Sequence, residues 1–283
     1  MSLIAHLTAI AETRRALWID SALYVQRVLA KGHDLPWDDT AAFVALSRKQ
    51  QQLVQSDVLT IDIGEYYRAV LNARSELVQA MGVRSRANYA LKTLLEDNVA
   101  ASQIGELVGA IAQIKGSNPL VIVCPSPKLW AESAFRMAQP VGEAEFGWQE
   151  AEKAAVYVAG FLRSFSQTGI DGVLIVDRAT ESPRNAEELQ AYAAVVNVAQ
   201  HYRWAAGLFQ SDGDCAIPPG VVDFIINNRP VAEIFSGAIL DQQLWASSNG
   251  MTLPSANFYF TRVPETTAPE VVLSQLQSVR GNV

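Results

Sequence analysis

The sequence predicts an α/β protein of the (βα)8 TIM-type barrel class, folded as a single domain over residues 1–283. Its length of 283 residues suits this fold, which needs about 250 residues. Short apolar runs alternate with helical stretches along the whole chain, which indicates parallel strands joined by right-handed crossovers. Hydrophobic residues make up 49% of the chain and charged residues 18%, so it can bury a large core and does not have the composition of a disordered protein.

Eight apolar runs are expected to be the strands. Each is short and closes on a polar residue, Gly or Pro, as is typical of parallel strands buried on both faces. The third and fourth runs are the clearest. Two runs are weaker: the second is short and ends on a carboxylate, and the first is shorter still and could instead be helical. In chain order the runs are Arg15–Asp20, Asp57–Asp62, Pro119–Pro125, Gly172–Asp177, Trp204–Phe209, Val221–Asn227, Val231–Phe235 and Asn257–Thr261.

Helical stretches lie between these runs. They show periodic apolar residues, begin after capping residues such as Thr40 and Asn185, and several end at a glycine. The stretch Val83–Asn98 is expected to form a helical excursion between the second and third strands, so that extra helices lie near residues 83–115. The remaining predicted helices are Ala41–Gln55, Glu65–Met81, Ala101–Lys115, Gln149–Gln167, Ala186–Tyr202 and Pro269–Val279.

Composition and charge exclude several classes of partner. The formal net charge is −7 and no run of Lys or Arg stands out, so no nucleic acid is expected. No window reaches 18 uninterrupted apolar residues, and Met1–Ala11 lacks the basic start and apolar core of a signal peptide, so no membrane association is expected. The isolated cysteines Cys124 and Cys215 fit a reducing compartment, and the expected location is the cytoplasm.

No pattern in the sequence indicates a metal or a cofactor. There is no zinc-type Cys/His spacing, no glycine-rich dinucleotide motif and no phosphate loop. Gln210–Cys215 has two carboxylates two residues apart but lacks the later Glu of a calcium loop, so a polar turn is the expected structure.

The catalytic candidate is Asp62, because catalytic groups of such barrels gather at the C-terminal ends of strands. Asp62 closes an apolar run, so its carboxyl group is expected to be partly desolvated, which raises the pKa and suits acid–base work or a cationic ligand. The alternative is an aspartate that caps a helix or forms an ion pair.

The other polar residues near strand ends are candidates for substrate binding. Arg178 and Arg262 could each bind a carboxylate or phosphate through two parallel hydrogen bonds. The alternative is that each pairs with a neighbouring carboxylate, such as Asp177 or Glu265. The full set of substrate-binding candidates is Asp20, Glu65, Ser126, Lys128, Asp177, Arg178, Gln210, Asp212 and Arg262.

Several stretches resemble the uroporphyrinogen decarboxylase family. Thr168–Asp177, Val231–Asp241 and Phe258–Val272 are similar to three of that family's strand and turn segments, and Asp57–Ile63 is similar to its second strand. The resemblance implies a (βα)8 barrel, shared with cobalamin-independent methionine synthase and corrinoid methyltransferases. It also implies cofactor-independent chemistry and pairing of two barrels in a homodimer.

The sequence departs from that family at most of its functional positions. The family's second-strand aspartate is kept as Asp62. The arginine motif of the first strand is replaced by Asp20–Tyr24, and the family's tyrosine falls at about Ser133. The family's serine after the fourth strand falls on Arg178, and its last-strand histidine on Arg262.

Three functions remain open at this point. The first is a cofactor-independent lyase, similar to a decarboxylase, that binds a carboxylated small molecule in the barrel mouth and uses Asp62. The second is a ligand-binding or regulatory barrel without catalysis. The third is a methyltransferase, which the lack of a His/Cys cluster in the sequence disfavours.

Overall fold

Eight parallel strands form a nearly closed barrel, which confirms the predicted fold class. The computed structural model describes residues 2–178, 183, 185–211, 217–240, 243–246 and 252–281. Neighbouring strands follow the order β1-β8-β7-β6-β5-β4-β3-β2, and each of these neighbouring pairs is parallel. The strands are β1 (Leu17–Asp20), β2 (Leu59–Asp62), β3 (Leu120–Pro125), β4 (Gly172–Val176), β5 (Ala205–Gln210), β6 (Phe224–Asn227), β7 (Phe235–Ile239) and β8 (Phe258–Arg262).

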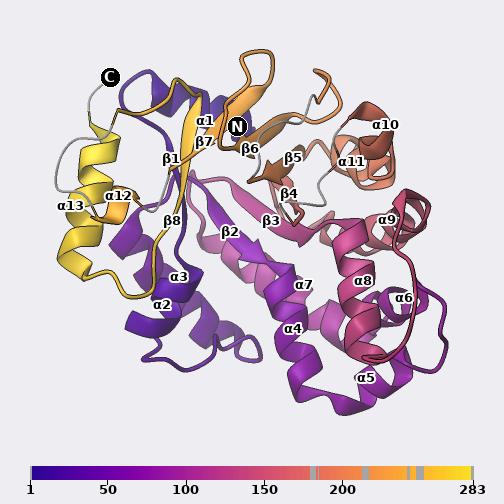
Figure 1. Ribbon diagram of the computed structural model, residues 1–283. Helices are drawn as coiled ribbons and strands as arrows, with labels where there is room; N and C mark the ends of the chain where they lie inside the picture. Colours follow the sequence, from indigo (N-terminus) through magenta and orange to yellow (C-terminus); the bar gives the residue numbers. More distant parts are fainter. Residues whose placement is uncertain are drawn as a thin grey trace.

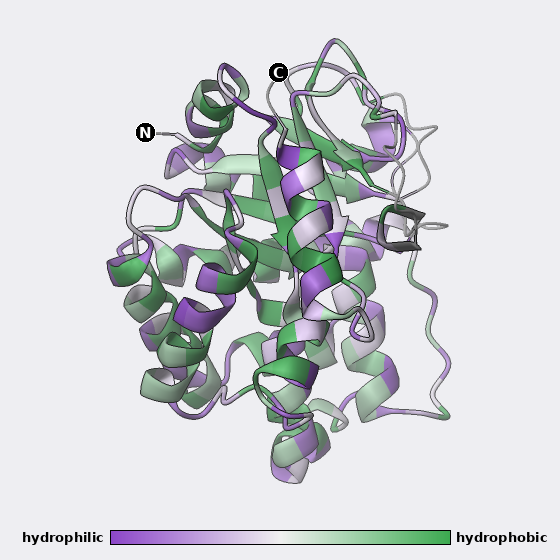
Figure 2. Cartoon of the chain, turned by 90° about the vertical axis from the view of Figure 1, so that its left-hand side faces the viewer, coloured by the Kyte–Doolittle hydropathy of each residue, from purple (hydrophilic) through white to green (hydrophobic). Residues whose placement is uncertain are grey.

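Helices surround the strands. In Figure 1 the strands lie in the centre, with α2, α3 and α13 on one side and α8 and α9 on the other. Figure 2 shows the strands mainly in the hydrophobic colour, whereas the helices carry both colours. The helices are α1 (Leu3–Ala11), α2 (Ala22–Val28), α3 (Thr40–Val54), α4 (Ile63–Ala73), α5 (Ser75–Met81), α6 (Tyr89–Leu95), α7 (Asn98–Ile114), α8 (Pro127–Ala138), α9 (Trp148–Leu162), α10 (Ala186–Gln190), α11 (Ala193–His201), α12 (Gln243–Ala246) and α13 (Pro269–Arg280).

Two predicted helices are each divided in two. The stretch Glu65–Met81 breaks at Arg74, whose guanidinium group bonds both oxygens of Asp97, at 2.7 and 3.0 Å. The stretch Ala186–Tyr202 breaks before Ala193, next to Tyr192, whose ring hydroxyl bonds to a strand-end aspartate. Both breaks therefore lie at residues whose side chains bond to partners 23 and 15 positions away, which helical periodicity does not reveal.

The predicted extra helices near residues 83–115 are confirmed by α6 and α7, which lie between β2 and β3. One of the two capping predictions is confirmed and the other is wrong. Asn185 caps α10 by accepting a hydrogen bond from the Glu188 amide at 2.9 Å. Thr40 is instead the first residue of α3, and Asp39 caps this helix through the Ala42 amide, also at 2.9 Å.

The prediction of a strand at Val231–Phe235 was wrong, because β7 begins where that run ends, at Phe235. The Ser236 hydroxyl lies early in β7 and donates to the carbonyls of Val231 and Ile234, at 2.8 and 2.9 Å. The strand contains a serine and a glycine, so its apolar signal is weaker than that of the turn before it.

Alternate residues of each strand face the barrel interior. The inward positions form an apolar cluster that includes Trp18, Leu174, Phe209 and Phe260. Leu3 and Leu7 of α1 belong to the same cluster. Helix α1 therefore closes the N-terminal end of the barrel, and the mouth is the opposite end, where the strands terminate.

Two glycines make room for the aromatic rings that fill the interior. Gly207 pairs directly with Phe224 of the next strand, and Gly237 pairs with Phe258 in the same way. A Cβ atom at Gly207 or Gly237 would lie 2.1 or 2.3 Å from its partner's ring. Both rings also contact Trp18, with centroid distances of 5.9 and 6.1 Å.

A recurring side-chain clamp joins each even-numbered strand to the strand before it. Asp171 donates its amide N–H to the Leu120 carbonyl, and its carboxylate accepts the Leu120 amide N–H, both at 2.8 Å. The same two-bond arrangement joins three further pairs at 2.8 to 3.0 Å: Asp57 with Leu17, Asp223 with Ala206, and Asn257 with Ser236.

The clamp matters most between β1 and β2, where no strand pairing is present in the described ladder. There the Asp57 clamp holds Leu17, and the Ser56 hydroxyl oxygen accepts the Ile19 amide N–H at 3.0 Å. Arg14 adds a bidentate ion pair to Asp57. Side chains therefore replace the missing backbone ladder at this seam.

Within the described ranges, the helices are all too short or too polar to span a lipid bilayer.

Candidate functional site

The mouth of the barrel exposes part of the inner wall to solvent. Thr60, Val123, Val176 and Ile239 lie at inward positions, yet each is only partly buried. Because α1 closes the opposite end, solvent reaches these residues from the mouth. Asp20, Asp62 and Arg262 occupy the next inward positions of β1, β2 and β8, at the rim of this wall.

Asp62 is both a helix cap and a partly desolvated carboxyl group, two roles that were expected to be alternatives. It caps α4, since its Oδ1 accepts the Glu65 amide N–H at 3.0 Å. Burial raises the pKa of the Asp62 carboxyl to about 6, against the lowering effect of the hydrogen bond from Glu65. The charges of Glu65 and Asp20 raise this pKa further. No cation pairs with Asp62 within the part of the chain that the structure describes.

The position of Asp62 depends on a close approach between α4 and β3. Gly64, in the first turn of α4, lies so near Pro125 that a Cβ atom there would be 2.6 Å from the proline Cγ and 3.1 Å from Asp62 Oδ1. Sequence reasoning missed both residues as part of the site. The signal that could have found Gly64 is its position two residues after a strand-end carboxylate.

Arg262 lies over the aromatic floor of the mouth and pairs with Asp20. Its Nε donates to Asp20 Oδ2 at 3.1 Å, and the two residues are register partners on β8 and β1. Its guanidinium carbon lies 5.0 Å from the ring centroid of Phe209 and 5.8 Å from that of Phe260. The side chains of Arg262 and Asp20 are 61% and 40% exposed, so this is an ion pair in contact with water. The alternative of a local ion pair is confirmed for Arg262, with Asp20 as its partner instead of Glu265.

Phe209 is a third residue of the site that could not be found from the sequence. It is the last residue of the predicted run Trp204–Phe209, and a phenylalanine at that position gave no chemical signal. Strand alternation places it inward, since Gln210 is the strand-end residue and faces the other way. The ring of Phe209 is the surface on which the Arg262 guanidinium rests.

Ser126 and Asp177 form a buried hydrogen-bonded group with Tyr192, outside the barrel wall. The Ser126 hydroxyl donates to Asp177 Oδ1, and the Tyr192 hydroxyl donates to Asp177 Oδ2 at 2.8 Å. Ser126 Oγ also accepts the Leu129 amide N–H at 3.1 Å and so caps α8. Strand alternation directs Asp177 away from the interior, because Val176 faces inward. This group joins β3 and β4 to the surrounding helices.

Three further candidates have partners on the surrounding helices. Arg178 donates to Glu132 of α8 at 3.0 Å. The Lys128 ammonium lies 4.8 Å from the ring centroid of Trp148. The Glu65 carboxylate pairs with Arg68 of the same helix at 2.8 Å. These partners lie on α8, α9 and α4.

Gln210 is buried at the end of β5, and its side-chain amide donates to the Pro183 carbonyl at 3.2 Å. It belongs to the layer between the strand and the following segment, not to the interior. Asp212, the remaining substrate-binding candidate, lies outside the described residues.

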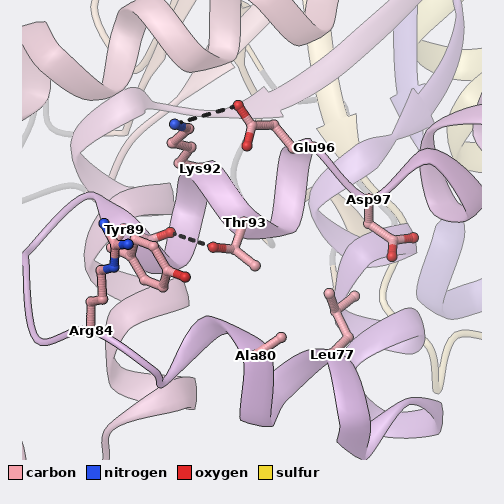
Figure 3. Close-up of a pocket in the computed structure, with 8 residues that line it drawn as sticks. All are labelled: Leu77, Ala80, Arg84, Tyr89, Lys92, Thr93, Glu96 and Asp97. Atoms are coloured by element: carbon pink, nitrogen blue, oxygen red, sulfur yellow. Dashed lines mark hydrogen bonds and ion pairs between the residues drawn. The ribbon is translucent and has the colours of Figure 1, made fainter.

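A hollow of about 500 Å³ lies between α5 and α6 and is lined by residues of these two helices and the segments that follow them (Figure 3). The charged groups in it have partners already: Lys92 pairs with Glu96 at 3.8 Å, and Asp97 pairs with Arg74. Arg84 lies over the Tyr89 ring at 5.2 Å. Because no unpaired, desolvated group faces this hollow, the barrel mouth is the better candidate site.

Groups of three or more His, Cys, Asp or Glu side chains suited to hold a metal do not occur among the described residues. No protein-family model matches the chain, and no curated protein matches it either.

Proposed function

We propose that the barrel mouth binds a carboxylated small molecule, with Arg262 as the partner of its carboxylate and Asp62 as the group that exchanges a proton with it. The observation that carries this proposal is Asp62. It is an inward-facing carboxyl group without a cationic partner among the described residues, and its pKa is raised to about 6. A group with a pKa near neutrality can both donate and accept a proton, which is what a general acid–base catalyst requires.

Arg262 is suited to bind an anion because its present partner is easily exchanged. An ion pair in contact with water contributes only about 0–1 kcal/mol, so a ligand carboxylate can take the place of Asp20 at little cost. The rings of Phe209 and Phe260 keep the guanidinium in place during this exchange.

The reaction class that these groups support is a cofactor-independent lyase. In a decarboxylation the bond to the carboxyl carbon breaks, carbon dioxide leaves, and the electron pair stays on the neighbouring carbon. Asp62 then donates its proton to that carbon and is reprotonated from water. The resemblance to the uroporphyrinogen decarboxylase family supports this class, since Asp62 is the residue kept from that family's pattern.

A ligand-binding barrel without catalysis is the second candidate. The observation that favours it is that the other strand-end groups already serve the fold. Arg178 pairs with Glu132, and Ser126 and Asp177 bond to each other and to Tyr192. The methyltransferase alternative has no supporting observation in the described residues, and homodimer formation remains a prediction from the resemblance.

A binding screen followed by a turnover assay tests the proposal. Thermal unfolding of the full chain is measured with a panel of small carboxylic acids and carboxylated tetrapyrroles. A ligand at 100 times its dissociation constant should stabilise the protein by about 2.7 kcal/mol. Arg262→Gln should remove this stabilisation. Asp62→Asn should keep the binding but abolish release of carbon dioxide.

Asp39→Asn is the matched control, since Asp39 caps α3 with the same geometry at an exposed position outside the barrel. Binding without turnover in the wild type would favour the second candidate. The proposal is wrong if no carboxylate stabilises the wild-type protein, or if Arg262→Gln binds carboxylates as tightly as the wild type does.

A further inference from the structure

The charges at the mouth do not balance. Among the residues of the described strands, the ionisable groups at inward positions of the rim are Asp20, Asp62 and Arg262. Arg178, which follows β4, pairs with Glu132 of α8. Arg262 and Asp20 neutralise each other, which leaves the Asp62 carboxylate without a counter-charge above its pKa. The nearby Glu65 pairs with Arg68 on the outer surface of α4 and supplies no cation.

We infer that the ligand of the mouth carries a cationic nitrogen, such as an ammonium group, in addition to its carboxylate. Its carboxylate would replace Asp20 on Arg262, and its ammonium group would bind Asp62. This inference rests on the proposed function and names the chemical class of ligand within it.

Charge balance favours such a zwitterion over a simple polycarboxylate. A dicarboxylate would add two negative charges to a mouth that already holds two carboxylates and one guanidinium. A zwitterion adds none, and it gives each charged group a partner of opposite sign. Once its carboxylate has taken Arg262, Asp20 is released beside Asp62 and can share the ammonium group, which offers three N–H donors.

The shape of the mouth supports the same class. The inner wall beside the charged groups, on β3, β4 and β7, is formed by side chains such as Val123, Val176 and Ile239, which are partly exposed. An apolar carbon chain would contact this wall while its two charged ends bind the groups at the rim. Pockets for small molecules commonly combine an apolar lining with a few polar groups that fix orientation.

A matched series of probes tests the inference on the full chain. The probes are 5-aminopentanoate, pentanoate, pentylamine and glutarate, which share one chain length and differ only in their terminal charges. Binding is measured by NMR titration at about pH 7.5, above the pKa of Asp62. We expect 5-aminopentanoate to bind at least about tenfold more tightly than pentanoate or glutarate, a difference of about 1.4 kcal/mol.

Two variants identify the groups responsible. Asp62→Asn should reduce the preference for 5-aminopentanoate over pentanoate to less than about threefold, whereas the capping control Asp39→Asn should leave it unchanged. Arg262→Gln should weaken pentanoate and 5-aminopentanoate alike. Circular dichroism of each variant establishes that it is folded.

The outcomes separate this inference from the proposed function. Glutarate or pentanoate binding as tightly as 5-aminopentanoate would overturn the inference and leave carboxylate binding intact. An unchanged preference in Asp62→Asn would overturn it as well. If no carboxylate probe binds, or if pentanoate binding survives Arg262→Gln, the proposed function fails together with the inference.

Discussion

At the scale of single residues, two effects oppose each other at Asp62: its role as a helix cap and the cost of burying its charge. Its carboxyl caps α4, yet burial disfavours the charged form and raises the pKa to about 6. A folded-state pKa above the unfolded value means that the carboxyl group stabilises the fold most when it is protonated. This contribution is fully present below about pH 4 and is lost as the pH rises through about 6.

Asp62→Asn should therefore stabilise the protein at neutral pH. Asn keeps the cap and removes the charge, and each unit of pKa shift corresponds to about 1.4 kcal/mol. Discounted for partial exposure, the expected gain in the free energy of unfolding at about pH 7.5 is ~1–2 kcal/mol. Denaturant unfolding measures it, and the gain should vanish as the pH falls to about 4. A loss of stability at neutral pH would contradict the raised pKa.

Gly207 and Gly237 should be sensitive to the smallest side chain. An added Cβ atom would overlap the ring of Phe224 or Phe258, so Gly207→Ala and Gly237→Ala should each destabilise the fold by ~1–3 kcal/mol or more. Gly105→Ala is the control, because Gly105 lies in α7 with nothing within 4 Å of the added atom. It should stabilise the protein by up to ~1 kcal/mol in the same unfolding assay. Equal effects at the three sites would contradict this packing.

At the scale of elements, the clamps join successive strands in pairs around the whole barrel, near the start of each even-numbered strand. Three clamps use Asp and one uses Asn, so a clamp requires an acceptor oxygen and not a negative charge. Asp223 offers the cleanest test, since its carboxylate bonds to the Ala206 amide.

Asp223→Asn should retain stability to within ~0.5 kcal/mol, because Asn257 makes the same two bonds on β8. Asp223→Ala should lose ~1–2 kcal/mol, because the buried Ala206 amide loses its acceptor. Chemical denaturation of the two variants gives the comparison. If both variants lose the same amount, the charge of Asp223 matters and the clamp interpretation is wrong.

The elements also show what the sequence could predict. Seven of the eight strands lie where they were expected, because runs such as Leu120–Pro125 are apolar on both faces. The predicted start of β7 was too early. This strand contains Gly237, which weakens its apolar pattern but leaves room for the ring of Phe258 on the next strand. The clamps could not be predicted, because an Asp before a strand can be assigned this role only when the neighbouring strand that it bonds is known.

The candidate site was predictable only in part, for the same reason. Asp62 was found from its place at the end of an apolar run. Asp177 had the same local signal, but strand alternation directs it outward to Ser126 and Tyr192. The pairing of Arg262 with Asp20 joins residues 242 positions apart and needs the closed barrel to bring β8 beside β1.

At the scale of the whole molecule, Cys124 reports on global opening of the barrel. It lies in the largest core cluster, between β3 and the surrounding helices, and is about 1% exposed. Burial raises the pKa of the Cys124 thiol well above its usual value, and the charge of Asp62 raises it further. In the folded state this thiol is therefore both inaccessible and protonated.

In a Cys215→Ser background, a thiol reagent should label Cys124 only when the barrel unfolds. The labelling rate then follows the population of the open state, so a variant more stable by ~1.4 kcal/mol should be labelled about tenfold more slowly. Adding Asp62→Asn should slow labelling at about pH 7.5, where the thiol of the unfolded chain still reacts, in parallel with its effect on unfolding. Mass spectrometry after timed exposure to iodoacetamide measures these rates. Fast labelling that does not respond to Asp62→Asn would mean that the segment around β3 opens locally, independently of the barrel.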